Sequence, residues 1–187
     1  MRKNFGPKPY SIPQPVHILA AYDEHGIPNA MNVAWAGVIG GRRMAFGLNP
    51  DRKTLKNLMA RGAFTVSIAD VPHMIQCDYL GLVSGNDVPD KLEKIGFHTI
   101  KAEFVDAPLI EELPMAVECK FISYDAEKYC LIGEIVNVCA DERILKEDGK
   151  VDTEKLQALA FDSMNKAYLR VGEKVGNAFR DGKKLME

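Results

Sequence analysis

Short runs of alternating apolar and polar residues, separated by turn-forming residues, limit what this chain can fold into. Residues 64–68 read Phe-Thr-Val-Ser-Ile, and residues 115–121 show the same alternation. A period of two predicts strands with one buried face. Apolar runs at residues 17–22 and 44–48 predict two further strands, and the first of these ends in an Asp-Glu-His-Gly turn.

Two longer segments complete the predicted strands. Residues 29–37 are expected to form one strand. Residues 129–138 are almost entirely apolar, which predicts a strand buried on both faces, and Gly133 predicts a bulge within it.

Helices are expected between the strands, without strict alternation. The apolar residues of segments 54–61 and 152–164 recur at helical spacing, and residues 72–80 and 90–95 are further candidates. Six or seven strands with inserted helices favour a mainly β protein over a doubly wound parallel sheet. The expected fold is an antiparallel β-barrel with peripheral helices.

Length and composition set the remaining limits. The 187 residues contain no repeat or linker and fit one domain, with a C-terminal helix and tail over about 152–187 that packs on the barrel or on a partner subunit. A formal charge of −2 offers no basic surface for nucleic acid, and no apolar run approaches the about 18 residues that indicate a membrane span. The four cysteines form no Cys-x-x-Cys pair, which favours reduced thiols and a cytoplasmic location.

The clearest local signal for a ligand site is the segment 49–57, Asn-Pro-Asp-Arg-Lys-Thr-Leu-Lys-Asn. A strand ends there and a helix begins near Lys53. Free N–H groups at a helix N-terminus attract anions, and Arg52, Lys53 and the Thr54 hydroxyl add charge and a donor. Asn57 lies one turn further on the same face. The alternative is an ordinary capped helix start in solvent. The sequence has no glycine-rich loop of the Walker or dinucleotide type.

A second signal is the segment 28–35, Pro-Asn-Ala-Met-Asn-Val-Ala-Trp. Asn29 and Asn32 carry both donors and acceptors, which suits the mixed edge of a heteroaromatic ring. The strand face around Gly47 is nearly bare and would let a flat ligand approach. The alternative is a strand that begins with turn-type asparagines and places Trp35 in the core.

These two segments and several shorter ones together resemble the FMN-binding split-barrel flavin reductase family, most closely its flavoredoxin branch. The likeness covers most of the chain, and the order and spacing of the pieces carry it. The pieces are Asn29–Asn32, Asp51–Thr54 with Asn57, Phe64–Ser67, Gly81–Gly85 with Asp90–Lys91, Leu113–Pro114 with Glu118–Cys119, and Gly133–Val136. The implied architecture is a single FMN-binding antiparallel split β-barrel over residues 1–187.

The resemblance also implies a homodimer with one FMN per subunit, bound near the dimer interface. By analogy, segment 52–57 holds the FMN phosphate, segment 29–32 faces the isoalloxazine edge, and Ser67 or its neighbours line the ribityl chain. Lys91 is carried over as a cation that reaches the phosphate or the pyrimidine end of the ring, with a solvated lysine as the alternative. Backbone amides near residues 30–33 would hydrogen-bond N5 and O4 of the ring and set its potential. The expected cofactor-binding residues are Asn29, Ala30, Met31, Asn32, Val33, Trp35, Arg52, Lys53, Thr54, Asn57, Ser67 and Lys91.

Two departures from the family pattern bear on nicotinamide binding more than on flavin binding. Many members that take hydride from a nicotinamide have Gly-Asp-His before the last barrel strand, whereas residues 125–129 here read Asp-Ala-Glu-Lys-Tyr, with Lys128 nearest the histidine position. A Thr-Ala-Asn-Ser type of pattern is also altered, since Val33 follows Asn32.

The function expected on this basis is that of an FMN oxidoreductase. Hydride from NADH or NADPH, or electrons from another carrier, would pass through bound FMN to an unidentified acceptor, and no side chain need act as acid or base. The alternatives are an electron carrier that does not use NAD(P)H, a flavin store or sensor, and a binding barrel without flavin. The four histidines have no metal-ligand spacing to one another or to a cysteine, so no metal site is expected.

Overall fold

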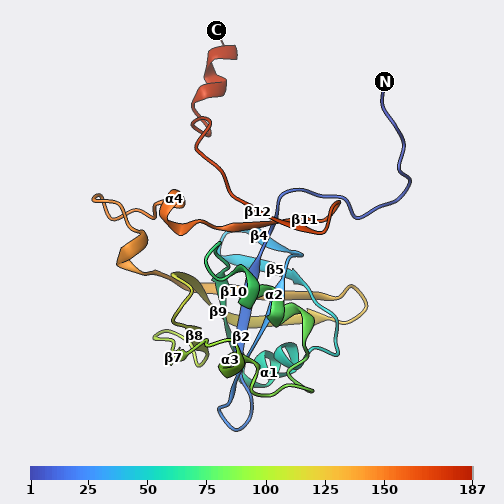
Figure 1. Cartoon of the computed structure of the whole chain (residues 1–187), viewed down its shortest axis with the longest axis vertical. Helices are drawn as coiled ribbons and strands as arrows, with labels where there is room; N and C mark the ends of the chain where they lie inside the picture. The colour runs from blue at the N-terminus through green and yellow to red at the C-terminus, as the bar shows by residue number, and fades with distance from the viewer. Residues whose placement is uncertain (187) are drawn as a thin grey trace.

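The computed structural model describes residues 1–186, and its main element is a seven-stranded antiparallel sheet (Figure 1). Short turns join three of the six pairs of neighbouring strands in this sheet. In spatial order the strands are β3 (Pro28–Val33), β2 (His17–Tyr22), β6 (Ala63–Ile68), β9 (Met115–Asp125), β10 (Cys130–Ala140), β5 (Arg43–Gly47) and β4 (Ala36–Gly40).

The sheet is curled, because its two edge strands are neighbours in the sequence. Only Ala34 and Trp35 separate the end of β3 from the start of β4. Seven flat strands would place the edges about 29 Å apart, whereas the step from Val33 to Ala36 spans about 10 Å at most. The sheet therefore forms a half-barrel that is split between β3 and β4, which confirms the expected antiparallel split barrel.

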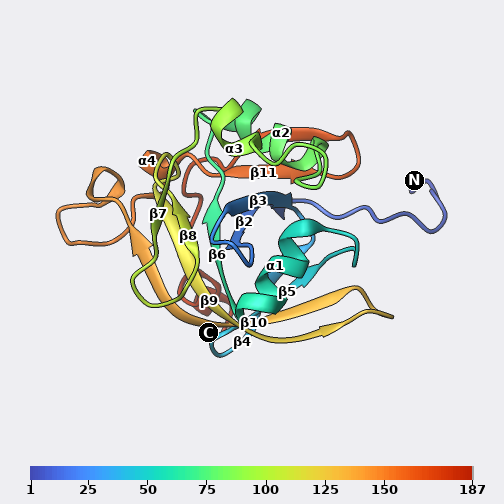
Figure 2. The same cartoon turned by 90° about the horizontal axis from the view of Figure 1, so that it is seen from below.

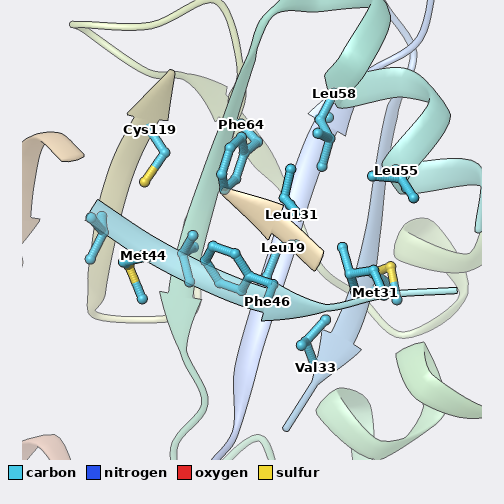
Figure 3. Packing of buried hydrophobic residues seen from close by; sticks show 14 residues of the cluster. Leu19, Met31, Val33, Met44, Phe46, Leu55, Leu58, Phe64, Cys119 and Leu131 are labelled. Atoms are coloured by element: carbon cyan, nitrogen blue, oxygen red, sulfur yellow. The ribbon is translucent and has the colours of Figure 1, made fainter. Parts of the chain in front are cut away.

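Side chains on the two faces of this sheet enter two separate cores. On β2, Leu19 points into the curl and Ile18 points outward. The inner core includes residues of α1 (Lys53–Arg61) and an edge-to-face pair, Phe46 and Phe64, with ring centroids 5.8 Å apart (Figure 3). The outer core is covered by α2 (Met74–Leu82), α3 (Lys91–Lys94) and β11 (Leu159–Asp162).

The C-terminal part of the chain corrects the expected helix over residues 152–164. Only α4 (Thr153–Leu156) is helical, and Gln157 ends it with a left-handed backbone at φ 49°. The chain then forms β11, which pairs with β1 (Gln14–Pro15) and β12 (Ala167–Arg170) in a three-stranded sheet. Leu159 and Ala160 are both buried, because β11 is packed on both faces. Adjacent apolar residues of this kind also occur on the buried face of a helix, which is why the sequence predicted a helix here. Beyond β12 the chain extends away from the body, as does the N-terminal segment (Figure 1).

Other boundaries also differ from the expectation. The predicted strand over residues 29–37 is two strands, β3 and β4, which lie at opposite edges of the sheet. The bulge at Gly133 is confirmed, but β10 is mostly half-buried instead of buried on both faces. A small sheet of β7 (Thr99–Lys101) and β8 (Pro108–Ile110) and two short 3-10 turns, η1 (Glu142–Ile144) and η2 (Asp181–Leu185), complete the described chain.

Cys77, Cys119, Cys130 and Cys139 are free thiols, as expected. No helix within residues 1–186 is long and apolar enough to span a membrane.

Candidate functional site

A cleft of about 420 Å³ lies where β3, the β5–α1 loop, α2 and the β11–β12 hairpin meet. It continues into a narrow pocket of about 40 Å³ at the start of α1. The two parts share Met31, Asn32, Arg52 and Gly81, so they form one elongated cavity. Below, the narrow part is called the cation end and the wide part the ring end. Figure 2 shows α2 beside β11, the two elements that bound the ring end from outside the barrel.

Three cationic residues gather at the cation end. Helix α1 begins after Arg52, and no side chain caps its N-terminus. Arg52, Lys53 and Lys91 all line the narrow pocket. Within residues 1–186 the one ion pair of this cluster joins Lys53 Nζ to Asp23 Oδ2 at 4.0 Å. Uncapped N–H groups and excess positive charge together favour an anion at this position.

Lys91 differs from Arg52 and Lys53 in its burial, since it is only 2% exposed. Its Nζ donates to the backbone oxygens of Leu80 at 3.4 Å and Val83 at 3.2 Å. Burial, together with the positive charges of Arg52 and Lys53, lowers the pKa of Lys91 to about 8. A solvated lysine, the alternative reading of this residue, is therefore wrong. An anion beside Lys91 would offset both the burial and the repulsion.

A hydrogen bond between buried side chains joins β3 to the start of α1. Asn29 Nδ2 donates to Thr54 Oγ1 at 2.6 Å, and both residues are buried. Asn29 Oδ1 has no partner within residues 1–186. The loop after α2 passes so close that a Cβ on Gly85 would overlap the Asn29 amide. This contact explains one glycine of the Gly81–Gly85 motif.

The ring end has apolar walls and one indole. Trp35 is 46% exposed and lines the cleft, so the alternative that places it in the core is wrong. The neighbouring strand can approach it because a Cβ on Gly47 would lie 3.1 Å from the Trp35 Cβ. Leu48 and Phe161 supply further apolar surface. Such walls suit a flat, largely apolar ligand.

Polar groups at the ring end form one network. Asn32 Nδ2 donates to the Cys77 backbone oxygen at 3.0 Å and lies 3.4 Å from Tyr168 Oη. Tyr168 Oη donates to Asp78 Oδ1 at 2.7 Å. Burial and this hydrogen bond to Asp78 raise the pKa of Tyr168 well above its ordinary value, so its hydroxyl stays protonated.

Most residues expected at the site line the cleft, and three do not. Ala30 faces the outer core, Asn57 is buried one turn along α1, and Ser67 is fully buried on β6. The side-chain atoms Asn57 Nδ2 and Ser67 Oγ have no partner within residues 1–186. Those that line either part of the cavity are Asn29, Met31, Asn32, Val33, Trp35, Arg52, Lys53, Thr54 and Lys91.

The residues that the sequence reasoning missed come from α2 and the C-terminal hairpin. Asp78, Phe161 and Tyr168 all line the ring end. Phe161 was missed because residues 152–164 were predicted to form a helix, whereas Phe161 lies on β11. Tyr168 was missed because no local sequence pattern indicates that it lines a cleft. The glycines at residues 81 and 85 were a usable signal, since both lie against the two asparagines of β3.

Comparison with known proteins identifies the family. Residues 10–160 match the model of the flavin reductase like domain. The chain therefore belongs to this family. Its split barrel and elongated cleft agree with that assignment.

Within the family, flavoredoxins are among the similar structures. Flavoredoxin of Desulfovibrio vulgaris (Miyazaki F) is 35% identical with a TM-score of 0.93, and the match covers 98% of this chain and 100% of that one. Flavoredoxin from Methanosarcina acetivorans is 28% identical with a TM-score of 0.87 over 100% of both chains. An FMN-binding domain of a flavin reductases-like enzyme from Shewanella baltica, 19% identical over 88% of this chain and 89% of that one with a TM-score of 0.77, shares the fold. The chain spans 30% of the length of one curated relative, an uncharacterized Aeropyrum pernix protein that is 30% identical over 79 residues, or 42% of this chain.

Proposed function

We propose that the cleft binds FMN, with the phosphate at the cation end and the isoalloxazine at the ring end. The observation that carries this proposal is the cation end itself. Arg52, Lys53 and Lys91 converge on an uncapped helix N-terminus, and within residues 1–186 the only carboxylate paired with any of these three cations is that of Asp23, at 4.0 Å from Lys53 Nζ. The names of similar structures support the same ligand, since one is an FMN-binding domain and two are flavoredoxins.

The donor set fits a phosphate monoester. One group needs to change for this fit. Asn29 Oδ1 is a buried acceptor without a partner in residues 1–186, and it would repel the oxygens of a phosphate beside it. Because the Thr54 hydroxyl can donate as well as accept, turning the Asn29 amide by 180° keeps their hydrogen bond with reversed polarity. The turned amide then presents Nδ2 to the phosphate. The wide part of the cleft, at about 420 Å³, is within the range of small-molecule sites, roughly 300–1,000 Å³.

The protein's own part in the reaction is binding and orientation. When bound, FMN supplies the electron-transfer chemistry. The cation end fixes one end of the ligand, and Trp35 and Leu48 limit how the ring can lie. The 46% exposure of Trp35 leaves this end open to a second reactant. Burial and the hydrogen bond to Asp78 raise the pKa of Tyr168, so its hydroxyl keeps its proton and serves as a hydrogen-bonding group at the ring end.

Flavin titration tests the proposal. The purified protein should be yellow, or should take up FMN with a change in flavin fluorescence. Lys53→Ala with Thr54→Ala should weaken FMN far more than riboflavin, because riboflavin has no phosphate. Lys56→Ala is the matched control, since Lys56 is exposed on the same helix and lines neither part of the cavity. Equal losses for the two flavins would remove the phosphate assignment, and a colourless protein that takes up no flavin would leave a flavin-free barrel.

We also infer that electrons pass through the bound FMN from NADH, NADPH or another carrier to an acceptor. One observation favours a carrier that does not use a nicotinamide. The outer mouth of the ring end is lined by Trp35, Gly47, Leu48, Asn49 and Tyr129, none of which is charged. The nearby cation Lys128 is paired with Asp125 at 2.6 Å. Anaerobic stopped-flow mixing with NADPH and NADH decides between a reductase, which bleaches the flavin in seconds or less, and a carrier, which reacts slowly. A protein that binds FMN but turns over with no donor would be a store or sensor.

We propose that the working unit is a homodimer. Val38 and Ile39 on the edge strand β4 are exposed, and Val175 and Phe179 on the extended C-terminal segment are 96% and 98% exposed. Apolar surface of this kind is typical of a protein interface. Size-exclusion chromatography with light scattering should give twice the monomer mass of 20.8 kDa. Deletion of residues 172–187 should weaken the dimer, and a monomeric wild-type protein would contradict the proposal.

A further inference from the structure

The orientation of the Asn32 side chain is fixed by its neighbours. A backbone carbonyl oxygen can only accept, so the amide atom 3.0 Å from the Cys77 oxygen must be Nδ2. The same nitrogen faces Tyr168 Oη at 3.4 Å. Asn32 Oδ1 forms no hydrogen bond within residues 1–186, although Asn32 lines both the ring end and the cation end. The junction of the two ends therefore carries an unused acceptor.

Tyr168 reinforces this orientation because Asp78 holds its proton. The Asp78 carboxylate accepts from Tyr168 Oη at 2.7 Å. With its one proton committed to Asp78, the Tyr168 hydroxyl can meet Asn32 only as an acceptor. The chain of hydrogen bonds therefore runs in one direction: Asn32 Nδ2 donates to Tyr168 Oη, which donates to the Asp78 carboxylate. The helix leaves room for this arrangement at Gly81, where a Cβ would lie 3.2 Å from the Asn32 Cβ.

We propose that Asp78 and Tyr168 are positioning residues that hold Asn32 Oδ1 ready to accept a hydrogen bond from the bound flavin. The inference rests on the proposed binding of FMN. An oxidised flavin offers two kinds of donor to such an acceptor, the N3–H of the ring and the hydroxyls of the ribityl chain. Because Asn32 lies where the two ends of the cavity meet, both kinds can be tested at this residue.

Three ligands separate the two donors. Riboflavin has both, 3-methylriboflavin lacks the N3–H, and lumiflavin lacks the ribityl chain. Affinities are measured by flavin fluorescence for the wild-type protein and for Asn32→Ala, Tyr168→Phe and Asp78→Asn. Tyr79→Phe is the matched control, because it removes a hydroxyl next to Asp78 from a residue that lines neither part of the cavity.

The expected result is a change in selectivity and not only in affinity. If the donor is N3–H, the preference for riboflavin over 3-methylriboflavin falls about fivefold in Asn32→Ala, in line with one hydrogen bond. Tyr168→Phe and Asp78→Asn should also reduce this preference, and Tyr79→Phe should leave it unchanged. If the donor is a ribityl hydroxyl, the same three variants should instead reduce the preference for riboflavin over lumiflavin, and Tyr79→Phe should again leave it unchanged. Tyr168→Phe should have no further effect on selectivity in the Asn32→Ala background.

Two outcomes would overturn the inference. One is that the variants weaken all three flavins by the same factor or leave all three unchanged. The other is that Tyr168→Phe alters selectivity equally with and without Asn32, which would mean direct contact with the ligand. Asp78→Asn, a change of nearly equal volume, serves if Tyr168→Phe does not fold. Failure of the wild-type protein to bind any flavin would instead contradict the proposed function, so the two failures are distinguishable.

Discussion

The two ends of the cavity are built in opposite ways. At the cation end two of the polar side chains that line the pocket are buried: Thr54 is 1% exposed and Lys91 2%. At the ring end Trp35 is 46% exposed, and the cleft is about ten times larger in volume. Buried, hydrogen-bonded groups lose little freedom when a ligand binds, whereas exposed walls leave space beside the ligand.

This difference suggests a division of roles. The cation end would supply affinity for the phosphate, and the ring end would leave one side of the flavin accessible to a donor or an acceptor. Changes at the cation end should then separate FMN from riboflavin, whereas changes at the ring end should affect the two flavins equally.

The largest effect is expected for Lys91→Met. Loss of a buried charge-assisted contact to the phosphate should weaken FMN about 100-fold, near the upper range for a hydrogen bond to a charged group. Riboflavin, which lacks the phosphate, should lose less than about threefold. Fluorescence titration of both flavins measures the ratio. The variant should fold at least as well as the wild-type protein, because it removes a buried charge with few partners, and thermal unfolding checks this. A loss shared equally by the two flavins would assign Lys91 to the ring.

A pair of glycine substitutions compares the two ends directly. In Gly85→Ala the new methyl group would overlap the Asn29 amide, and in Gly81→Ala it would press on Asn32 at 3.2 Å. Overpacking of this kind costs about 1–3 kcal/mol, or roughly fivefold to 150-fold in affinity if the whole cost falls on binding. Gly85→Ala should therefore weaken FMN more than riboflavin, and Gly81→Ala should weaken both alike. The same titrations decide, and the division of roles fails if the two variants give the same FMN-to-riboflavin ratio.

A pH effect of about tenfold is expected at the cation end. The pKa of Lys91 is lowered to about 8, so the free protein loses this charge as the pH rises above 8. Phosphate favours protonated Lys91 and raises its pKa, so FMN binding above pH 8 takes up a proton and weakens by up to about tenfold per pH unit. Between about pH 6, the second pKa of a phosphate monoester, and pH 8 the affinity should be flat.

Two controls accompany the pH titration. Riboflavin should show no alkaline decrease, and Lys91→Arg, whose guanidinium stays charged, should abolish the decrease for FMN. An alkaline decrease that persists in Lys91→Arg would assign the titration to another group.

The two ends also differ in how far the sequence predicts them. Arg52, Lys53 and Thr54 are consecutive, so a helix start with positive charge was visible as a local pattern. The ring end collects Trp35, Asp78 and Tyr168 from three distant segments. Their proximity depends on the packing of α2 and the C-terminal hairpin against the barrel, which no local pattern encodes.

The same reasoning explains the errors within the fold. Strands β6 and β9 follow from alternation, because each has one face in the inner core. Strand β11 is packed on both faces, and its adjacent apolar residues Leu159 and Ala160 resembled a helix. On β6 the alternation showed that Ser67 lies on a hydroxyl-bearing face, but it did not show that the outer core buries that face.

Ser67→Ala should have the smallest effect of the changes considered. Ser67 is fully buried, its Oγ has no hydrogen-bond partner within residues 1–186, and it lines neither end of the cavity. Ser67→Ala replaces an unpaired buried hydroxyl with a hydrogen, which removes a desolvation penalty, so the free energy of unfolding should stay the same or rise by about 1 kcal/mol. Affinity for FMN and for riboflavin should be unchanged. Chemical denaturation and flavin titration measure the two quantities. If riboflavin binding fell tenfold while stability held, Ser67 would contact the ribityl chain, and the ligand would have to reach past β3 into the sheet instead of lying along the cleft.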